Sequence, residues 1–351
     1  MKKRREGIYG CGCENGRKFG SARLQSEFER DNPLICLLTD YKRDEAPYLV
    51  RSAIRVIKPD ARIEDITHEI PAFNILSGAW RLARVVSAPT EAEGTIYVAV
   101  VDPGVGGERK NLIIGTKDGR YLVGPDNGLL SLAFQEAGLE CAVSIDNWEL
   151  TLRRFAKSST FEGKDVFGPV AAHLANGVQI REFGEKVDPN HLRQINLSLE
   201  STPKLHKGHL VDIDEFGNLR TNIENGSLDA LDCARVIVSC RGLKLFDRTA
   251  YRDLDVRTNF ESGKDGSVFL VRSSTGCLDI VKKQGDASRE LRITFNQIGL
   301  TADLRPISEV LIDRSIADRD ARGADRNPVS IDVRSSGREC VPSMLCGNAV
   351  G

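Results

Sequence analysis

An acidic and a basic residue flank a glycine-rich turn in the first third of the chain. Asp102 directly follows the apolar run 96–101, and the turn Pro-Gly-Val-Gly-Gly at 103–107 leads to Arg109. Glycine-rich turns at strand ends are where α/β proteins bring backbone amides and side chains to a small ligand. Such a turn can fold Arg109 back beside Asp102, where a guanidinium keeps a carboxylate charged. The spacing favours an active-site pair; the alternative is a surface turn with an incidental ion pair.

Three more predicted strands end in polar residues. Leu-Leu-Thr at 37–39 ends in Asp40, residues 63–68 end in a polar cluster, and the strand at 120–123 leads into Gly-Pro-Asp-Asn-Gly at 124–128. Because the carboxyl ends of parallel strands meet at one edge of a sheet, these groups are expected to converge there. The sequence therefore predicts one site rather than four unrelated turns.

Two patterns of periodicity divide the chain. Strands alternate with amphipathic helices up to residue 177, which predicts a helix-covered, mostly parallel sheet, with strands at 34–39, 61–66, 95–101, 111–115 and 120–123 and helices at 48–57, 74–87, 127–137 and 166–177. Short strands separated by turn residues predict a small all-β barrel or sandwich after it, with strands at 208–213, 218–222, 234–239, 267–271, 277–281 and 290–295. A short strand or helix is expected at 307–316.

The length of 351 residues accommodates two domains. We expect an α/β domain at 33–200 and a β domain at 205–300. Residues 1–32 and 305–351 lack apolar periodicity and are predicted to be a disordered N-terminal extension and a mostly disordered tail.

Composition excludes several functional classes. The formal net charge of −1 gives no electrostatic footprint for nucleic acid. No apolar run approaches the ~20 residues that span a bilayer, and no apolar segment follows the basic residues 2–5 as a secretory signal would require. A cytoplasmic protein with no membrane partner is expected.

The cysteines, histidines and glycines indicate no metal site, catalytic triad or phosphate loop. Nine cysteines are present, and neither Cys11 with Cys13 nor Cys340 with Cys346 has a histidine at zinc-ligand spacing. The other five are expected to be free thiols: Cys36, Cys141, Cys233, Cys240 and Cys277. The five histidines form no triad signature, and the turn at 103–107 lacks the Gly-Lys-Ser/Thr of a phosphate-binding loop.

Taken together, seven motifs resemble one family, the S-adenosyl-L-methionine hydroxide adenosyltransferases, which are homologous to the fluorinase and the chlorinase. They occur in the family's order across about residues 34–300: Leu-Thr-Asp40, Asp65-Ile-Thr-His68, Gly78-Ala79, Asp102-Pro-Gly-Val-Gly-Gly-Glu-Arg109, Gly124-Pro-Asp-Asn-Gly-Leu-Leu130, Thr160-Phe-Glu-Gly-Lys-Asp165 and Asp214-Glu-Phe-Gly-Asn218-Leu-Arg-Thr-Asn222.

The resemblance implies a fold, an assembly and a reaction. It implies an N-terminal α/β domain with a central, mostly parallel sheet and a smaller C-terminal β-barrel domain. It implies homotrimers whose active sites lie where one subunit's N-terminal domain meets a neighbour's C-terminal domain. The implied reaction is attack of water or hydroxide on ribose C5′ of S-adenosyl-L-methionine, giving adenosine and L-methionine with no metal and no cofactor.

The resemblance also implies catalytic residues, with one departure. Asp102 and Arg109 match two members of a proposed Asp-Arg-His trio that holds the water, but Glu162 stands where the family has histidine. Glu162 could accept a proton if its surroundings favoured the neutral form, and hydrolysis would be retained. The alternative is an S-adenosylmethionine or nucleoside-binding protein with impaired turnover. A halogenase is less favoured, because Asp102 replaces the halogenases' tyrosine and a carboxylate would repel a halide.

Six further residues match substrate contacts of the family. The implied partners are the ribose hydroxyls for Asp40, a face of the nucleoside for Phe73, and the methionine and adenine ends for Asp214, Phe216, Asn218 and Ser274. The alternatives are a strand-end cap for Asp40, core packing for Phe73 and ordinary β-turn residues for the rest. The loop after Asp40 is one residue longer than the family's, so another nucleophile or nucleoside stays open.

Overall fold

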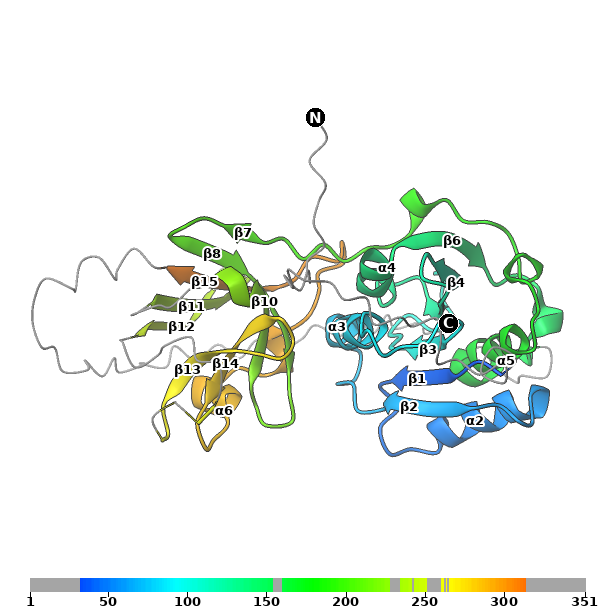
Figure 1. The fold of residues 1–351 in the computed structure, drawn as a ribbon, viewed down its shortest axis with the longest axis horizontal. Helices are drawn as coiled ribbons and strands as arrows, with labels where there is room; N and C mark the ends of the chain where they lie inside the picture. The colour runs from blue at the N-terminus through cyan, green and yellow to red at the C-terminus, as the bar shows by residue number, and fades with distance from the viewer. Residues whose placement is uncertain are drawn as a thin grey trace, which may run out of the picture.

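The computed structural model describes residues 32–153, 160–227, 234–241, 243–250, 260–261, 263 and 265–313. Two lobes are visible, an α/β lobe that contains β1 to β6 and a β-rich lobe that contains β7 to β15 (Figure 1). Both predicted disordered tails lie outside the described residues, apart from residue 32 and residues 305–313.

The elements of the N-terminal lobe follow one another in the order β1 (Ile35–Thr39), α2 (Ala46–Ile57), β2 (Ile63–Thr67), α3 (Ile75–Val86), β3 (Ile96–Val100), β4 (Asn111–Thr116), β5 (Tyr121–Pro125), α4 (Ser131–Ala137), β6 (Leu139–Ser144), η2 (Trp148–Leu150), η4 (Gly163–Phe167), α5 (Gly168–Ala175), η5 (Ile180–Glu182) and η6 (Pro189–His191). Those of the C-terminal lobe are β7 (Glu200–Ser201), β8 (Leu205–Gly208), β9 (Leu210–Ile213), β10 (Leu219–Glu224), η7 (Asn225–Ser227), β11 (Ala234–Cys240), β12 (Leu243–Ala250), β13 (Val268–Arg272), β14 (Cys277–Lys282), α6 (Ala287–Leu291), η9 (Phe295–Gln297) and β15 (Ser308–Asp313).

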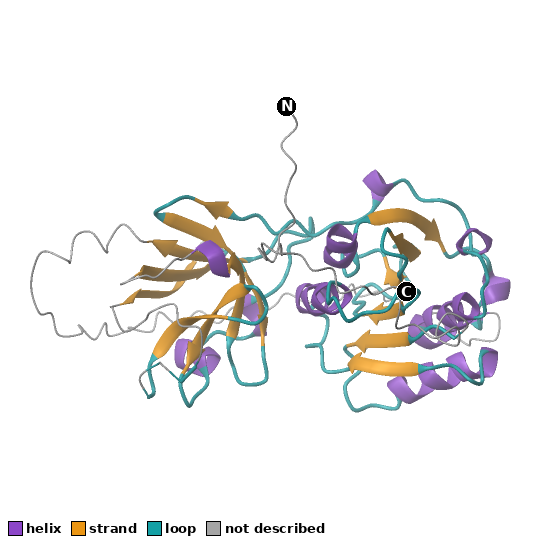
Figure 2. Ribbon diagram, viewed as in Figure 1, coloured by secondary structure: helices purple, strands orange, loops and turns teal. Residues whose placement is uncertain are grey.

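The N-terminal lobe is built on one six-stranded sheet of order β2-β1-β3-β5-β4-β6. Neighbouring strands are parallel except at β4, which runs antiparallel to both β5 and β6. Helices α3 and α4 pack on one face and α2 and α5 on the other (Figure 2), so β1, β3 and β4 are buried along their whole length. The predicted mostly parallel, helix-covered sheet is confirmed, because continuous apolar strands need cover on both faces.

The C-terminal lobe consists of two antiparallel sheets, β13-β14-β10-β9 and β12-β11-β15-β8-β7. Its all-β, antiparallel character is confirmed, and closure into a barrel stays a prediction. The element expected at 307–316 is a strand, β15, which pairs with β11 on one side and β8 on the other. The five-stranded sheet therefore includes residues beyond the boundary expected at 300.

The strand predicted at 290–295 is wrong. The segment contains the end of helix α6 and the start of η9, because Asp286 caps α6 by accepting a 2.8 Å hydrogen bond from the Arg289 N–H. Leu291 and Ile293 are buried and alternate with exposed neighbours, so the burial pattern imitates a strand. Strands β6 and β12 were not predicted from the sequence.

The segment that contains Glu162 continues as a π-helical turn, η4, before α5 begins. The Gly168 N–H donates to the Gly163 carbonyl, five residues earlier. A Cβ atom on Gly163 would overlap the Tyr41 hydroxyl, and the Tyr41 ring packs edge-on against Phe161 with centroids 5.5 Å apart. Gly163 thus leaves room for the hydroxyl group of the half-buried Tyr41 at the residue that follows Glu162.

Helix α3 joins the two lobes. Asp212 of β9 is 1% exposed at its side chain, accepts a 2.6 Å hydrogen bond from the Ser77 hydroxyl and pairs with the Arg81 guanidinium at 2.9 Å. Arg84 donates to the Thr275 carbonyl at 3.0 Å, and the Asn74 side chain donates to the Ile298 carbonyl at 2.7 Å. The carboxylate of Asp212 is therefore a main polar link between the lobes.

Asp212→Ala is expected to lower the free energy of unfolding by about 3 kcal/mol, the low end for breaking a buried ion pair, because Arg81 can regain water. Urea denaturation followed by circular dichroism measures the change. The control is Asp303→Ala, which removes an exposed carboxylate paired with Arg305. Equal stability of the two variants would contradict the assigned role of Asp212.

Gly163→Ala is expected to destabilise the fold by about 1–3 kcal/mol, because the added methyl group overpacks the site. Tyr41→Phe removes the nearest atom, so the double variant Gly163→Ala/Tyr41→Phe should regain most of that loss. Thermal unfolding of both single variants and the double variant measures the coupling. Additive losses would show that Tyr41 is not what limits the space at Gly163.

Candidate active site

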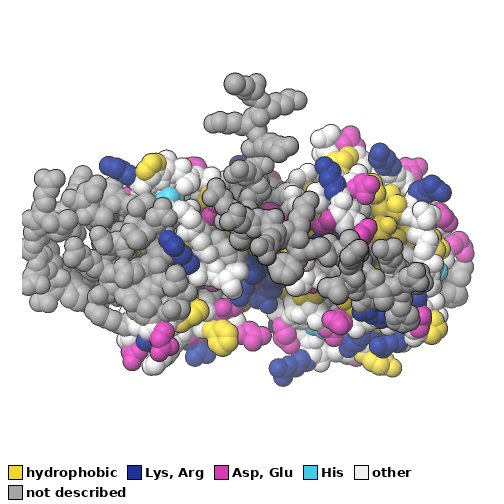
Figure 3. Space-filling view, viewed as in Figure 1, with side chains coloured by type: hydrophobic (Ala, Val, Ile, Leu, Met, Phe, Trp, Pro, Cys, Tyr) yellow, Lys and Arg dark blue, Asp and Glu magenta, His cyan; other side chains and the backbone are white. Residues whose placement is uncertain are grey.

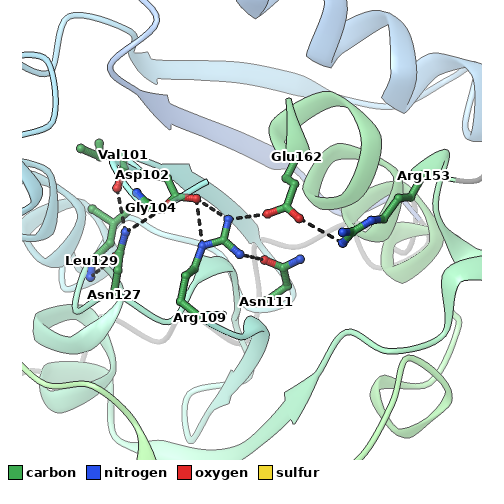
Figure 4. A network of polar contacts seen from close by, with 9 residues as sticks. All are labelled: Val101, Asp102, Gly104, Arg109, Asn111, Asn127, Leu129, Arg153 and Glu162. Carbon is green, nitrogen blue, oxygen red and sulfur yellow. Dashed lines mark hydrogen bonds and ion pairs between the residues drawn. The ribbon is translucent and has the colours of Figure 1, made fainter. Parts of the chain in front are cut away.

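The turn at 103–107 does fold Arg109 back beside Asp102. The Arg109 Nε donates to Asp102 Oδ2 at 2.9 Å, and Nη2 bridges Asp102 and Glu162 (Figure 4). The side chains of Asp102, Arg109 and Glu162 are 3%, 8% and 4% exposed. The structure therefore brings the three predicted catalytic residues together, with one guanidinium between two buried carboxylates.

Neighbouring motifs hold the Asp102 carboxylate in place. Its Oδ1 accepts hydrogen bonds from the Gly104 N–H at 3.2 Å and from the Asn127 side-chain amide at 3.5 Å. Asn127 is itself fixed, since it donates to the Val101 carbonyl at 2.9 Å and accepts from the Leu129 N–H at 3.1 Å. The second strand-to-turn junction thus positions the carboxylate of the first.

Arg109 is a permanent cation in this setting. Burial lowers the pKa of Arg109, but its hydrogen bonds to Asp102 and Glu162 outweigh burial and raise the pKa above its usual value. Asn111 accepts from the remaining guanidinium nitrogen, and the Phe167 ring lies 6.0 Å from the guanidinium carbon. All of the guanidinium's nitrogens therefore have partners, which fixes its orientation.

A cavity of about 320 Å³ opens beside this cluster. Its lining includes Asp40, Phe73, Asp102 and Glu162. The strand ends that lead into Asp40 and Asp102, which were predicted to converge, therefore do so. The backbone N–H of Phe73 donates to Asp40 Oδ2 at 2.9 Å. Phe73 is 68% exposed and has a left-handed φ of 64°, so its expected alternative, core packing, is wrong.

Asp40 carries a perturbed carboxylate. Burial raises the pKa of Asp40 above its ordinary value, with a smaller contribution from the charge of Asp102, although the Phe73 N–H opposes the shift. Asp40 is therefore an acceptor at neutral pH whose protonation begins at a higher pH than for an exposed aspartate.

A second cavity, of about 480 Å³, shares Phe73 and Asp102 with the first as lining residues. Arg109, Asn127 and Arg193 line it before the C-terminal lobe begins, and nine residues between Phe295 and Ile307 line it after the last strand of the four-stranded sheet. Asp102 and Arg109 are thus reached from this junction between the lobes as well.

The four site residues predicted in the C-terminal lobe lie apart from Asp102, and none of them is among the described residues that line either cavity. Asp214 Oδ1 accepts the N–H groups of Phe216 and Asn218, both at 3.0 Å, as a turn residue does. Phe216 is 75% exposed, and Ser274 is exposed in the turn between β13 and β14. Their role in a site stays a prediction.

Three residues near the cluster were not predicted from the sequence. Arg153 donates to Glu162 Oε1 at 3.1 Å, Asn111 accepts from Arg109, and Tyr41 lines the smaller cavity. Asn111 stands two residues after Arg109, a spacing that places side chains on one face of an extended chain and could have identified it. Arg153 belongs to no motif, and no sequence signal marks it.

His68 and Asp65 lie between strand ends, away from the cluster. His68 Nδ1 is 2.8 Å from the Thr39 hydroxyl and Nε2 is 3.2 Å from Asp65 Oδ1.

Among the described residues, no group of three or more His, Cys, Asp or Glu side chains could hold a metal ion, and the described cysteines are free thiols. No helix within the described ranges is long and apolar enough to cross a membrane. Acidic and basic side chains are interspersed over the described part of the face in Figure 3.

Several known proteins are similar to this chain. The (R)-S-adenosyl-L-methionine hydrolase of Methanocaldococcus jannaschii is 32% identical over 273 residues, which cover 75% of this chain and 93% of that protein. The hydrolase of the same name from Salinispora arenicola is 32% identical and covers 77% of this chain and 98% of its own length. A fluorinase from Actinopolyspora mzabensis is 23% identical over 56% of this chain and 74% of that enzyme.

A solved structure shares the fold. The crystal structure of an uncharacterized conserved protein from Thermotoga maritima superposes with a TM-score of 0.67 at 30% identity, covering 80% of this chain and all of that one. The family model for the SAM hydroxide adenosyltransferase N-terminal domain matches residues 35–184, and the model for the C-terminal domain matches residues 208–298. The chain belongs to the SAM hydroxide adenosyltransferase family.

Proposed function

We propose that this protein hydrolyses S-adenosyl-L-methionine to adenosine and L-methionine. The observation that carries the proposal is the buried Asp102–Arg109 pair at the wall of a cavity that also contains Asp40. Two relatives that match this chain over more than nine-tenths of their own length carry the name (R)-S-adenosyl-L-methionine hydrolase, which supports the same reaction here. The smaller cavity, with its acidic and aromatic lining, suits a ribose and its C5′ carbon.

The reaction needs an in-line displacement at C5′. A water oxygen forms a bond to C5′ while the C5′–S bond breaks. The electron pair of the C5′–S bond stays on sulfur, so the sulfonium becomes the neutral thioether of methionine. A sulfonium leaves without protonation, so placing the water is most of the task. The water loses one proton as it attacks, and a fixed carboxylate acceptor assists that loss.

In this proposal, Asp102 is the carboxylate that accepts a hydrogen bond from the attacking water and assists the loss of its proton. Arg109 holds the Asp102 carboxylate through Nε and Nη2, and the Gly104 N–H fixes the other oxygen, so the acceptor is oriented before substrate binds. Glu162 shares the same guanidinium and replaces the family's histidine as third member. Asp40 would accept the ribose hydroxyls, and the exposed Phe73 ring would pack on the nucleoside.

We extend the proposal to a homotrimer in the cytoplasm. Asp214, Phe216, Asn218 and Ser274 do not line the described cavities of their own chain, and Phe216 is 75% exposed, so these residues would complete the site of a neighbouring copy. The described cysteines are free thiols, which suits a reducing compartment.

Asp102→Ala is expected to reduce adenosine formation by about 10²–10⁴-fold, because the water loses its acceptor and its orientation. Incubation with S-adenosylmethionine, with and without chloride, followed by chromatography of the nucleosides measures the product. Asp265→Ala, which removes an exposed carboxylate of the C-terminal lobe that lines neither cavity, should keep the wild-type rate.

Three outcomes are distinguished in that assay. Adenosine and methionine in equal amounts support hydrolysis. Substrate binding by the wild type without any product would make the chain a binding protein and overturn the proposal. A chlorinated nucleoside that forms only with chloride would instead assign a halogenase.

The KM for S-adenosylmethionine is expected to rise as the pH falls through the raised pKa of Asp40. The carboxylate accepts the ribose hydroxyls, so protonation removes an acceptor, and burial makes this happen at a higher pH than for an exposed aspartate. Kinetics between about pH 4 and pH 8 measure the effect. Asp40→Asn should raise KM at neutral pH and flatten its pH dependence; an unchanged KM would remove Asp40 from the ribose site.

A further inference from the structure

The geometry points to Arg153 as a positioning residue that pairs with the Glu162 carboxylate and orients it in the site. This inference rests on the proposed hydrolase function and deepens it. Acidic and basic side chains alternate along one row, Asp102–Arg109–Glu162–Arg153 (Figure 4). Arg153 closes the row by donating from Nη1 to Glu162 Oε1 at 3.1 Å.

Charge balance explains why this arginine is needed. Without Arg153, Arg109 would be the one cation among the described residues that pairs with two carboxylates, which are 3% and 4% exposed, and one buried negative charge would lack a described partner. A neutral histidine at position 162, which the family resemblance implies, would leave one acid with one base and would need no second cation. Arg153 therefore supplies the second positive charge that a glutamate at position 162 needs.

Arg153 is held in place. The Leu152 N–H donates to the Asp165 carbonyl at 2.8 Å, which ties the segment that contains Arg153 to the π-helical turn that follows Glu162. The guanidinium carbon lies 4.5 Å from the centroid of the Trp148 ring, and the Arg153 N–H donates to the Thr151 hydroxyl at 3.2 Å. The arginine side chain is 36% exposed, yet stacking and the backbone bond restrict it far more than an ordinary surface ion pair.

The two guanidinium groups together orient Glu162. Arg109 donates a hydrogen bond to Glu162 Oε2 and Arg153 donates one to Oε1, so both carboxylate oxygens are held. Glu162 also lines the smaller cavity. Loss of Arg153 would free one oxygen and allow the glutamate to rotate about its side-chain torsions. Because Glu162 shares Arg109 with Asp102, that rotation would also disturb the acceptor of the attacking water.

The test is a mutant cycle on S-adenosylmethionine hydrolysis with purified full-length protein. Arg153→Gln is expected to lower kcat by about tenfold with little change in KM, because a misplaced group affects the chemical step. Arg153→Lys should recover part of the rate, since it keeps the charge but not the planar fork. The control is Arg181→Gln, an exposed arginine on η5, which should keep the wild-type rate.

Coupling to Glu162 separates positioning from a purely structural role. If Arg153 acts through Glu162, the double variant Arg153→Gln/Glu162→Gln should be no slower than Glu162→Gln alone. Hydrolysis by the Glu162→His variant should be slowed by the guanidinium of Arg153, which faces the new histidine. The double variant Glu162→His/Arg153→Gln should therefore hydrolyse S-adenosylmethionine several-fold faster than Glu162→His. Circular dichroism and thermal unfolding check that each variant folds; if Arg153→Gln does not fold, Arg153→Lys and Glu162→His carry the comparison.

The outcomes distinguish this inference from the proposed function. A wild type that forms no adenosine overturns the proposed function and the inference with it. A wild type that turns over while Arg153→Gln matches Arg181→Gln overturns the inference alone. Independent, multiplicative losses from Arg153→Gln and Glu162→Gln would also overturn it, because Arg153 would then act by another route.

Discussion

The candidate site depends on one guanidinium placed between two buried carboxylates. Arg109 contacts both Asp102 and Glu162, and each of the three side chains is at least nine-tenths buried. Charges so far from water are tolerated only when every one is paired and hydrogen-bonded. The glycine-rich turn, Asn127 and the π-helical turn can all be understood as parts that keep this pairing complete.

Local sequence spacing predicted the parts of the cluster that depend on short-range geometry. Asp102 and Arg109 stand seven residues apart on one turn, so the chain has little freedom to separate them. The burial of the helix-covered strands also followed from their continuous apolar runs. The reversed direction of β4 could not be predicted in this way, because an apolar run carries no information about strand direction.

Features that depend on tertiary contacts were not predicted. Arg153 reaches Glu162 because the Leu152 N–H binds the Asp165 carbonyl, a contact between segments with no shared pattern. The strand expected at 290–295 was wrong because alternating burial occurs there in a capped helix followed by a 3₁₀ turn. In the second case a side-chain cap overrides the hydrophobic periodicity.

Strand β15 has a consequence for where the C-terminal lobe can be shortened. The family match ends at residue 298, yet β15 (Ser308–Asp313) is inserted between β11 and β8 in the five-stranded sheet. A chain cut at that match would expose two unpaired strand edges and would lose six residues from the wall of the larger cavity: Gly299, Leu300, Thr301, Ala302, Leu304 and Ile307. Open edges of this kind pair with other molecules, so the shortened protein would aggregate rather than merely lose activity.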